Sequence, residues 1–340
     1  MSVASDLFEV VDRAPTSLTD RFRPLTLDSY RRLTRAFPPR RGSAQYGSGW
    51  LYLTQACRNA LTPLGSFYED ATFAVGLGRH NNHWVIVRPV GQVPPTFLSS
   101  LLALVRSTGA RPYVYVKMAD SPMRRQIRQT ARARGIEVLG AKHYPWDASS
   151  RHDDQTCPDV LMDVSQVCDI AYARGEPARK LRSKVRRFHS LYPKVTFTTV
   201  AALGHQQVRA MLSQHFGADQ SYIESYTNMI TILGAPSADD TWWHFVPVID
   251  GEAVGLFAYE LVDTTSAAVY ASVAHHRYTG LNEAMMVEMS MRMRGHGFLT
   301  ANLGGSEKLS LYRYKLKFAA KGGSSVPRHP ICVLDFSSVL

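Results

Sequence analysis

The chain has 340 residues, of which 45% are hydrophobic and 20% are charged, with a formal net charge of +11. This composition excludes wholesale disorder, and the length predicts two domains of about 150 residues each. The positive charge favours a polyanionic partner such as RNA, DNA or an anionic lipid surface, the alternative being a basic protein without such a partner.

The first half of the chain shows strands alternating with helices. Residues 1–45 have weak periodicity, and the Pro-Pro-Arg-Arg-Gly stretch at 38–42 is typical of a loop. Two strand-like runs, 71–77 and 83–90, flank a Gly- and Asn-containing segment and predict a β-hairpin. The elements predicted after it are a helix over 94–107, a strand over 113–116, a helix over 123–134 and strands over 136–139 and 159–164. This alternation predicts an α/β layer.

The second half repeats a similar order of elements. A helix over 177–191 is predicted first, and Asp250-Gly251 joins two strands in a hairpin. The full set is a strand over 195–200, helices over 206–216 and 220–233, strands over 242–249, 253–261 and 267–273, a helix over 281–294, a strand over 300–303, a helix over 309–318 and a strand over 331–336. We expect an N-terminal domain over 1–165, a connection over 166–176 and a C-terminal domain over 177–340, with structural duplication as a topological hypothesis.

The four cysteines are scattered singly, and no histidine lies at metal-ligand spacing beside them. This pattern predicts buried small side chains in a reducing compartment and no metal site. The first residues lack the basic start and apolar run of a signal peptide. The longest near-apolar run, 97–105, is far shorter than the roughly 20 residues that a membrane helix needs. We therefore expect a cytoplasmic protein without a membrane segment.

Two glycine-containing turns are candidate binding elements. Arg277, Gly280 and Asn282 follow a predicted strand and open a helix, where free backbone N–H groups can bind an anion. The alternative is a plain turn with a helix cap. Residues Asn302, Gly304, Gly305 and Ser306 follow another strand, and ligands of α/β sheets gather beyond the carboxyl ends of strands. The alternative there is a tight turn into the next helix.

The last predicted helix carries Lys315 and Lys317, which point to different faces because they lie two residues apart. A fixed ammonium in a water-poor site stabilises the oxyanion that develops when an ester is attacked. A solvated basic helix is the alternative reading.

Basic residues also crowd the helix over 177–191: Arg179, Lys180, Arg182, Lys184, Arg186 and Arg187. They spread around most of its circumference, as expected for contacts to a nucleic-acid backbone that do not read sequence. A solvated interdomain helix is the alternative. Five arginines over 124–134 form a second basic helix.

The order and spacing of these motifs resemble two related families. The segment Asn302-Leu303-Gly304-Gly305-Ser306, followed by Tyr314-Lys315-x-Lys317-Phe318, resembles the end of the Fem-type peptidyl transferases and of the C-terminal domain of lysyl-phosphatidylglycerol synthases. The resemblance covers about residues 175–325. It implies two tandem GNAT-like domains and aminoacyl-tRNA as the donor.

The resemblance also implies roles for individual residues. Lys315 would contact the oxyanion or the tRNA 3′ end, and Asn302, Gly304 and Gly305 would line the aminoacyl pocket. Tyr312 or Tyr314 would protonate the leaving hydroxyl. Asn282 stands where acetyl-CoA-dependent members have a small residue, and the membrane-spanning half of the lipid synthases has no counterpart here.

We therefore expect an α/β (α+β) protein of two tandem GNAT-like domains, each a mixed central sheet flanked by helices. Its expected activity is transfer of an amino acid from aminoacyl-tRNA to an amine or hydroxyl acceptor, with no metal or other cofactor. The acceptor could be a natural product, a peptidoglycan precursor or a lipid head group. The alternatives are an acyl-CoA-dependent GNAT acyltransferase, a non-enzymatic RNA-binding protein and a degenerate GNAT half that only scaffolds.

Overall fold

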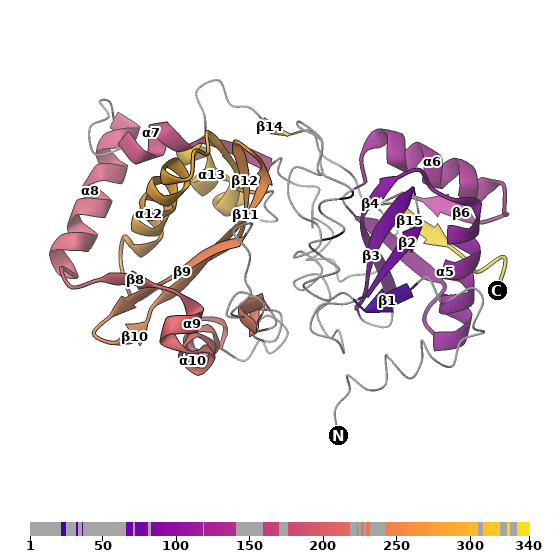
Figure 1. The fold of residues 1–340 in the computed structure, drawn as a ribbon, viewed down its shortest axis with the longest axis horizontal. Coiled ribbons are helices and arrows are strands. Elements are labelled where there is room, and N and C mark those ends of the chain that lie inside the picture. Colours follow the sequence, from indigo (N-terminus) through magenta and orange to yellow (C-terminus); the bar gives the residue numbers. More distant parts are fainter. Residues whose placement is uncertain are drawn as a thin grey trace. The chain divides into compact units, whose positions relative to one another are not determined.

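The computed structural model of the chain describes residues 22–24, 32, 36, 66–70, 72–80, 83–117, 119–140, 159–169, 176–217, 223, 226–227, 229–231, 242–304, 309–319, 325–326 and 332–340. The chain divides into two compact units, the first formed by 1–156 and 327–340 and the second by 157–326 (Figure 1). The expected loop at 38–42, most of the expected helix over 220–233, and Gly305 and Ser306 lie outside the described residues.

The first unit is built on a mixed sheet whose described strands run in the order β1-β2-β3-β4-β5-β15-β6. These strands are β1 (Phe22–Pro24), β2 (Ser66–Asp70), β3 (Phe73–His80), β4 (His83–Gly91), β5 (Tyr113–Lys117), β6 (Glu137–Leu139) and β15 (Cys332–Asp335). The hairpin predicted from the strand-like runs is β3–β4, which is antiparallel. The next strand, β5, returns parallel to β4.

Helices α5 and α6 of the first unit pack against this sheet in a hydrophobic core. Helix α5 (Pro95–Thr108) begins with proline in its first turn and ends at Gly109, whose φ of 57° suits glycine. Helix α6 (Ser121–Arg132) is capped by Asp120, whose side chain accepts a hydrogen bond from the Met123 N–H. Both helices lie where periodicity predicted them, within one or two residues at each end.

The second unit has a mixed sheet in the order β10-β9-β11-β12-β13-β7-β14, with β8 also paired to β9. The strands are β7 (Asp159–Asp163), β8 (Thr196–Thr198), β9 (Trp242–Ile249), β10 (Glu252–Ala253), β11 (Gly255–Asp263), β12 (Ser266–Ala274), β13 (Thr300–Asn302) and β14 (Ser325–Val326). Asp250 and Gly251 have φ of 50° and 84° in the tight turn between β9 and β10, as the Asp-Gly pair predicted.

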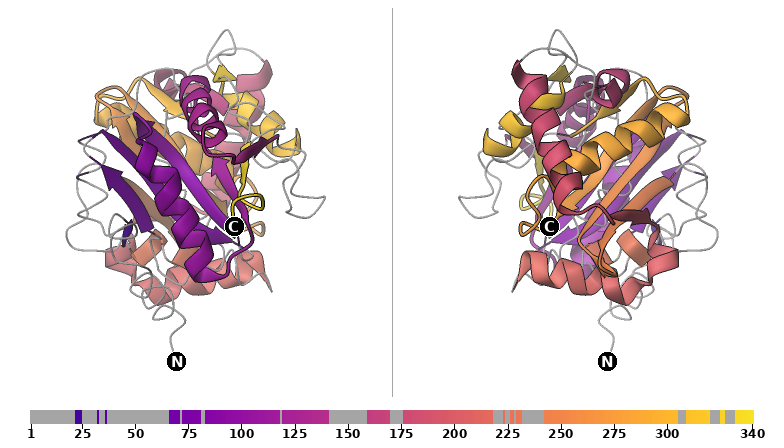
Figure 2. Two further views of the ribbon diagram at one scale, coloured as in Figure 1. Left: turned by 90° about the vertical axis from the view of Figure 1, so that its right-hand side faces the viewer. Right: turned by 90° about the vertical axis from the view of Figure 1, so that its left-hand side faces the viewer.

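The described helices of the second unit are α7 (Val164–Cys168), α8 (Glu176–Leu191), α9 (Val200–Leu203), α10 (His205–Phe216), α12 (Leu281–Gly295) and α13 (Leu309–Lys315), the last continued by the 3-10 turn η3 (Leu316–Phe318). Of these, α7, α8, α12, α13 and η3 pack with the sheet around one hydrophobic core. The right view of Figure 2 shows α8 and α12 side by side across one face of this sheet. Four methionines of α12 are buried, so its Met-rich sequence fills the core.

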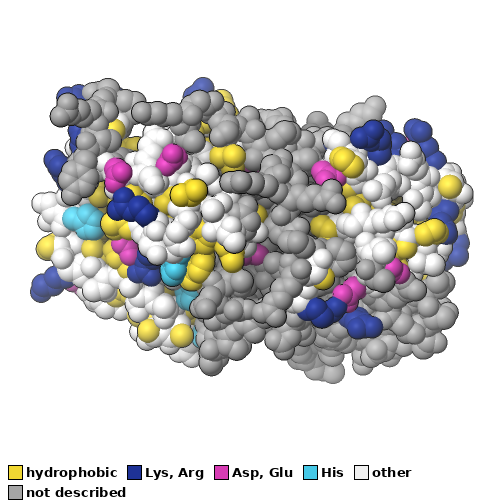
Figure 3. Space-filling model, turned by 45° about the horizontal axis from the view of Figure 1, so that its top comes forward, with side chains coloured by type: hydrophobic (Ala, Val, Ile, Leu, Met, Phe, Trp, Pro, Cys, Tyr) yellow, Lys and Arg dark blue, Asp and Glu magenta, His cyan; other side chains and the backbone are white. Residues whose placement is uncertain are grey.

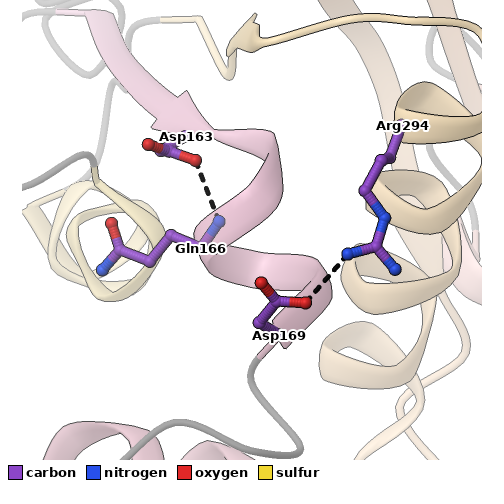
Figure 4. Close-up of polar contacts among 4 residues, drawn as sticks. All are labelled: Asp163, Gln166, Asp169 and Arg294. Atoms are coloured by element: carbon purple, nitrogen blue, oxygen red, sulfur yellow. Dashed lines mark hydrogen bonds and ion pairs between the residues drawn. The ribbon is translucent and has the colours of Figure 1, made fainter.

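Polar contacts fix the short helix α7 between its strand and α12 (Figure 4). The Asp163 carboxylate accepts a hydrogen bond of 2.9 Å from the Gln166 N–H and so caps the helix start. At the other end, Arg294 of α12 donates to Asp169 at 2.8 Å. Both partners of this ion pair are exposed, so it contributes about 1 kcal/mol at most.

The two units have the same order of elements, which supports the duplication hypothesis. In each, an antiparallel meander leads through a helix, α5 or α12, to a strand parallel to the last meander strand. In each, one further strand runs antiparallel beside that parallel strand: β15 beside β5, and β7 beside β13.

The positions of β7 and β15 differ from those that the expected domain boundaries give them. We expected 159–164 in the N-terminal domain and the last strand in the C-terminal domain, whereas β7 pairs in the second sheet and β15 in the first. The physical reason is that β5 and β13 each need a partner for their outer backbone groups, and the pattern of a strand does not specify which sheet it joins.

Within the described part, none of the helices is long and apolar enough to cross a membrane. The two cysteines that the structure describes, Cys168 and Cys332, are buried free thiols, as their single, scattered positions in the sequence predicted.

Candidate functional site

The candidate site lies where two parallel strands of the second sheet separate. Strands β12 and β13 pair over only three positions, from Ser266↔Thr300 to Ala268↔Asn302. Strand β12 continues to Ala274, but beyond Ala268 no strand in the described part pairs with it on that side. Openings of this kind, outside the carboxyl ends of strands, are where α/β sheets bind ligands.

A chain of hydrogen bonds fixes the backbone just beyond β13. The Asn302 amide donates from Nδ2 to Asp159 Oδ2 at 3.0 Å, and its Oδ1 accepts from the Gly304 N–H at 2.7 Å. The Gly304 carbonyl in turn accepts from Lys315 Nζ at 3.1 Å. The Lys315 ammonium of α13 is therefore held at the first turn after the strand, beside the opening.

The Asn302 side chain has a structural role in addition to the expected place of this residue in the aminoacyl pocket, which stays a prediction. Its buried side chain uses both polar atoms to hold Asp159 of β7 and the turn at Gly304. Gly304 has a φ of 70°, and a Cβ built there would lie 3.8 Å from Lys315 Nζ. Asp159 was not among the candidate residues, because its pairing partner lies 143 residues away in the sequence.

The two candidate tyrosines of α13 lie on different faces. Tyr314 packs its ring edge-on against Phe318, and the Lys317 ammonium lies 5.1 Å above the same ring. Its hydroxyl is buried with no hydrogen-bond partner in the described part. Tyr312 lies three residues before Lys315 and so shares its side of the helix. Of the two tyrosines, Tyr312 is therefore the one placed on the Lys315 side.

The pKa of Tyr314 supports the same distinction. Burial raises the pKa of its hydroxyl well above the usual value, and the negative charge of Glu283 raises it further. A hydroxyl with such a pKa remains protonated at neutral pH and is a poor proton donor to a leaving group.

The glycine turn before α12 is shaped by helix α8. Gly280 has a φ of 89°, and a Cβ built on it would lie 2.8 Å from the Lys184 carbonyl oxygen. Glycine is therefore required at this position by backbone geometry and by the close approach of α8. Arg277 is exposed, and Asn282 Oδ1 accepts from Ser272 Oγ at 3.3 Å.

An ion pair between an exposed lysine and a buried glutamate links α8 to α12 beside this turn, and neither spacing nor composition indicated it. Lys184 Nζ lies 2.7 Å from Glu283 Oε1, with the Glu283 side chain 6% exposed and that of Lys184 50% exposed. An acidic residue in the first turn of α12 is favourable to the helix dipole. That signal was available in the sequence, but the burial of Glu283 follows from the packing of α8.

The basic residues of α8 cover its solvent side. Leu181 and Phe188 are buried in the core. Of the basic set, Arg182 is half-buried and the others are exposed: Arg179, Lys180, Lys184, Arg186 and Arg187. Apart from the Lys184 ammonium, which pairs with Glu283, the positive charge of this helix therefore lies on its solvent side, where a polyanion can reach it.

Next to the glycine turn, the rings of His275 and His276 stack with centroids 4.8 Å apart. Burial lowers the pKa of His275, and the neighbouring His276 and Arg277 lower it further, so His275 is neutral near pH 7. Among the described residues, no group of three or more His, Cys, Asp or Glu side chains is arranged to hold a metal ion.

Comparisons with known proteins show which solved structures have a similar fold. A scan against protein-family models finds none that matches, and a search of curated proteins finds no match either. Solved structures do match at low sequence identity. A conserved protein of unknown function from Bacteroides thetaiotaomicron has a TM-score of 0.63 and 15% identity, over 92% of this chain and 98% of that one.

Two further solved structures carry informative names. L-PGS from Bacillus licheniformis has a TM-score of 0.54 and 12% identity, over 93% of each chain. FemX has a TM-score of 0.50 and 11% identity, over 92% of this chain and 96% of that one. The similarity to the Fem and lysyl-phosphatidylglycerol synthase folds is confirmed, and with it the expected fold class of two tandem GNAT-like domains with mixed sheets flanked by helices.

Proposed function

We propose that the protein is an aminoacyl transferase that moves an amino acid from aminoacyl-tRNA to an amine or hydroxyl acceptor. The observation that carries this proposal is the Lys315 ammonium, held by the Gly304 carbonyl beside the opening between β12 and β13. The fold shared with L-PGS and FemX supports the same class of reaction. The acceptor is a natural product, a peptidoglycan precursor or a lipid head group.

The proposed reaction needs no covalent intermediate on the enzyme. The acceptor nitrogen or oxygen attacks the ester carbonyl of the aminoacyl-tRNA, its proton passes to solvent water, and a tetrahedral oxyanion forms. Lys315 stabilises that oxyanion, since a fixed positive charge stabilises a developing negative charge more strongly in a water-poor site than in solvent. Collapse of the intermediate breaks the bond to the ribose oxygen, which takes a proton from Tyr312, and the Tyr312 oxygen then regains a proton from solvent.

The tRNA would be held by its backbone. The basic set of α8 (Arg179, Lys180, Arg182, Lys184, Arg186 and Arg187), together with Lys317, supplies the positive charge. Such contacts position the acceptor stem without reading its sequence. In this proposal Arg277, Gly280 and Asn282 border the donor site from the start of α12, and Gly305 and Ser306, which follow Gly304 in the sequence, contribute to binding the aminoacyl group.

The direct test is transfer of label from charged tRNA. We would charge tRNA with a mixture of radiolabelled amino acids, add an extract of the source cells, and compare label loss with and without the protein. We expect protein-dependent transfer of one amino acid to a new product. Thermal stabilisation by coenzyme A with no transfer from any charged tRNA would instead favour an acyl-CoA-dependent acyltransferase. Tight tRNA binding without turnover would indicate an RNA-binding protein.

The two tyrosines of α13 should respond in opposite ways to removal of their hydroxyls. Tyr312→Phe should lower kcat at least about tenfold, because a positioned proton donor is lost. Tyr314→Phe should leave kcat within about threefold and raise the free energy of unfolding by about 1 kcal/mol, because its buried hydroxyl is unpaired. Transfer kinetics and thermal unfolding measure the two effects.

Tyr259→Phe provides a matched control for the stability effect. The Tyr259 hydroxyl on β11 is also buried without a partner among the described residues, and no role in transfer is proposed for it. We expect Tyr259→Phe to raise the free energy of unfolding by about as much as Tyr314→Phe does, and to leave kcat unchanged. A large loss of kcat in Tyr314→Phe with Tyr312→Phe unaffected would reverse the assignment of the proton donor.

A further inference from the structure

Helix α6 of the first unit carries a one-sided row of arginines. Arg125, Arg128 and Arg132 are exposed and Arg124 is half-buried. At 3.6 residues per turn these four positions fall within about 100° of the helix circumference and extend along about 12 Å of its axis. Figure 3 shows Lys and Arg side chains gathered on the side of the molecule where Figure 1 places α6. We call these four residues the α6 arginine row.

The arginine row forms no ion pair within the described part of the protein. Arg125, Arg128 and Arg132 form no ion pair or side-chain hydrogen bond there, and α6 itself contains no acidic residue. Arg124 donates to Ser121 Oγ at 3.1 Å, while its buried Nε has no partner. By contrast, Arg292 of α12 is paired with Glu288 at 2.7 Å.

The fold does not require this concentration of charge. Met123, Ile127 and Ala131 supply the packing face of α6, and Asp120 caps its first turn. Like charges four residues apart on a helix are destabilising, by a few tenths of a kcal/mol for each pair, and Arg124, Arg128 and Arg132 form two such pairs. A row that is unfavourable to the isolated helix, and that no acid neutralises within the described part, is suited to an external anion.

The chemistry of the row favours a repeating phosphate chain. Guanidinium groups bind phosphate oxygens in a bidentate manner, which a single ammonium cannot do. A membrane surface fits less well, because helices that lie in a membrane interface insert an apolar face, and the apolar face of α6 is buried in the core of its own unit.

We propose that the α6 arginine row binds the phosphate backbone of RNA, at a surface of the first unit distinct from the candidate transfer site of the second. That the bound RNA is the body of a tRNA rests on the proposed function. The binding of RNA to the row does not rest on it, because this binding requires only the four arginines and their charge.

The test compares a triple variant with a matched control in the full chain. The variant Arg125→Gln, Arg128→Gln and Arg132→Gln removes three charges from the row and keeps good helix-forming residues. The control Arg111→Gln, Lys194→Gln and Arg209→Gln removes three exposed charges from other elements. Binding of uncharged tRNA is measured by fluorescence anisotropy at several salt concentrations, and thermal unfolding confirms that both variants fold.

We expect the slope of log affinity against log salt to fall by about 2 to 3 in the row variant, because each lost phosphate contact removes about 0.7 to 0.9. The control should change the slope by less than about 1. Equal slopes in the two variants would overturn the proposal. It would also be overturned if the row variant lost binding to phosphatidylglycerol vesicles while its tRNA slope stayed that of the unmodified protein.

This experiment separates the inference from the proposed function. Uncharged tRNA binds without any chemical step, so a reduced slope supports the row even if no amino acid is ever transferred. Conversely, the row variant could show full transfer activity together with an unchanged salt slope. That result would support the proposed transferase function and exclude the α6 arginine row as an RNA-binding surface.

Discussion

Lys315→Met should lower kcat for aminoacyl transfer by about 100-fold or more, because removing one preorganised oxyanion-stabilising group typically costs about 10² to 10³ in rate. The variant keeps a side chain of similar length and loses the charge that Gly304 holds in position. The measurement is single-turnover transfer from charged tRNA with the acceptor at saturation. The Michaelis constant for the acceptor should change much less, because the charge acts on the transition state.

Two further variants show whether the lower kcat of Lys315→Met comes from the missing positive charge. Arg313→Gln lies on the same helix, is exposed and has no proposed role, so it should transfer at the normal rate. Lys315→Arg keeps the positive charge and should recover part of the activity. Thermal unfolding controls for the lost hydrogen bond to Gly304. A folded Lys315→Met variant with less than a threefold loss would exclude Lys315 as the oxyanion contact.

Gly280→Ala should destabilise the protein more than any of the other substitutions proposed above. The left-handed φ of 89° costs an alanine about 1 to 2 kcal/mol. Its Cβ would also meet the Lys184 carbonyl at 2.8 Å and the Phe188 Cβ at 3.2 Å, and overpacking adds about 1 to 3 kcal/mol. Calorimetry should show a lower transition temperature, by about 2 to 4 °C for each kcal/mol at this domain size.

Gly297→Ala is the matched control for Gly280→Ala. Its φ is 83°, but a Cβ built there meets nothing within 4 Å. It should therefore show only the backbone cost of about 1 to 2 kcal/mol. If the two variants lost the same amount of unfolding free energy, α8 would have shifted to accommodate the new Cβ without an energetic penalty. The close contact between α8 and the turn would then not be the reason why position 280 requires glycine.

Local features of the sequence were enough to predict most elements near the site. The hairpin around Asp250-Gly251, helix α12 and the end of β13 at Asn302 all lie within two residues of their predicted positions. Each depends on signals carried by neighbouring residues, such as turn-forming pairs and the 3.6-residue period. The tandem GNAT-like fold was implied by the resemblance of the segments 302–306 and 314–318 to two known families.

The arrangement of the site could not be predicted in the same way. Asp159 reaches Asn302 across 143 residues, and Lys184 reaches Glu283 across 99. The spacing of three residues already placed Tyr312 on the Lys315 side of a helix, but only the packing of α13 showed that the Tyr314 hydroxyl is buried without a partner among the described residues. Such pairings depend on which strand and which helix become neighbours, and local periodicity does not encode that choice.

The sequence by itself therefore determined the elements, their order and the residue types near the opening, since these follow from local propensity and hydrophobic period. The tertiary structure alone decided that β7 and β15 join sheets other than those expected and that Gly280 accommodates helix α8. It also placed Asn302 as the support of Lys315. The physical reason is that backbone pairing and close packing are satisfied between segments distant in the chain, where many partners are chemically equivalent.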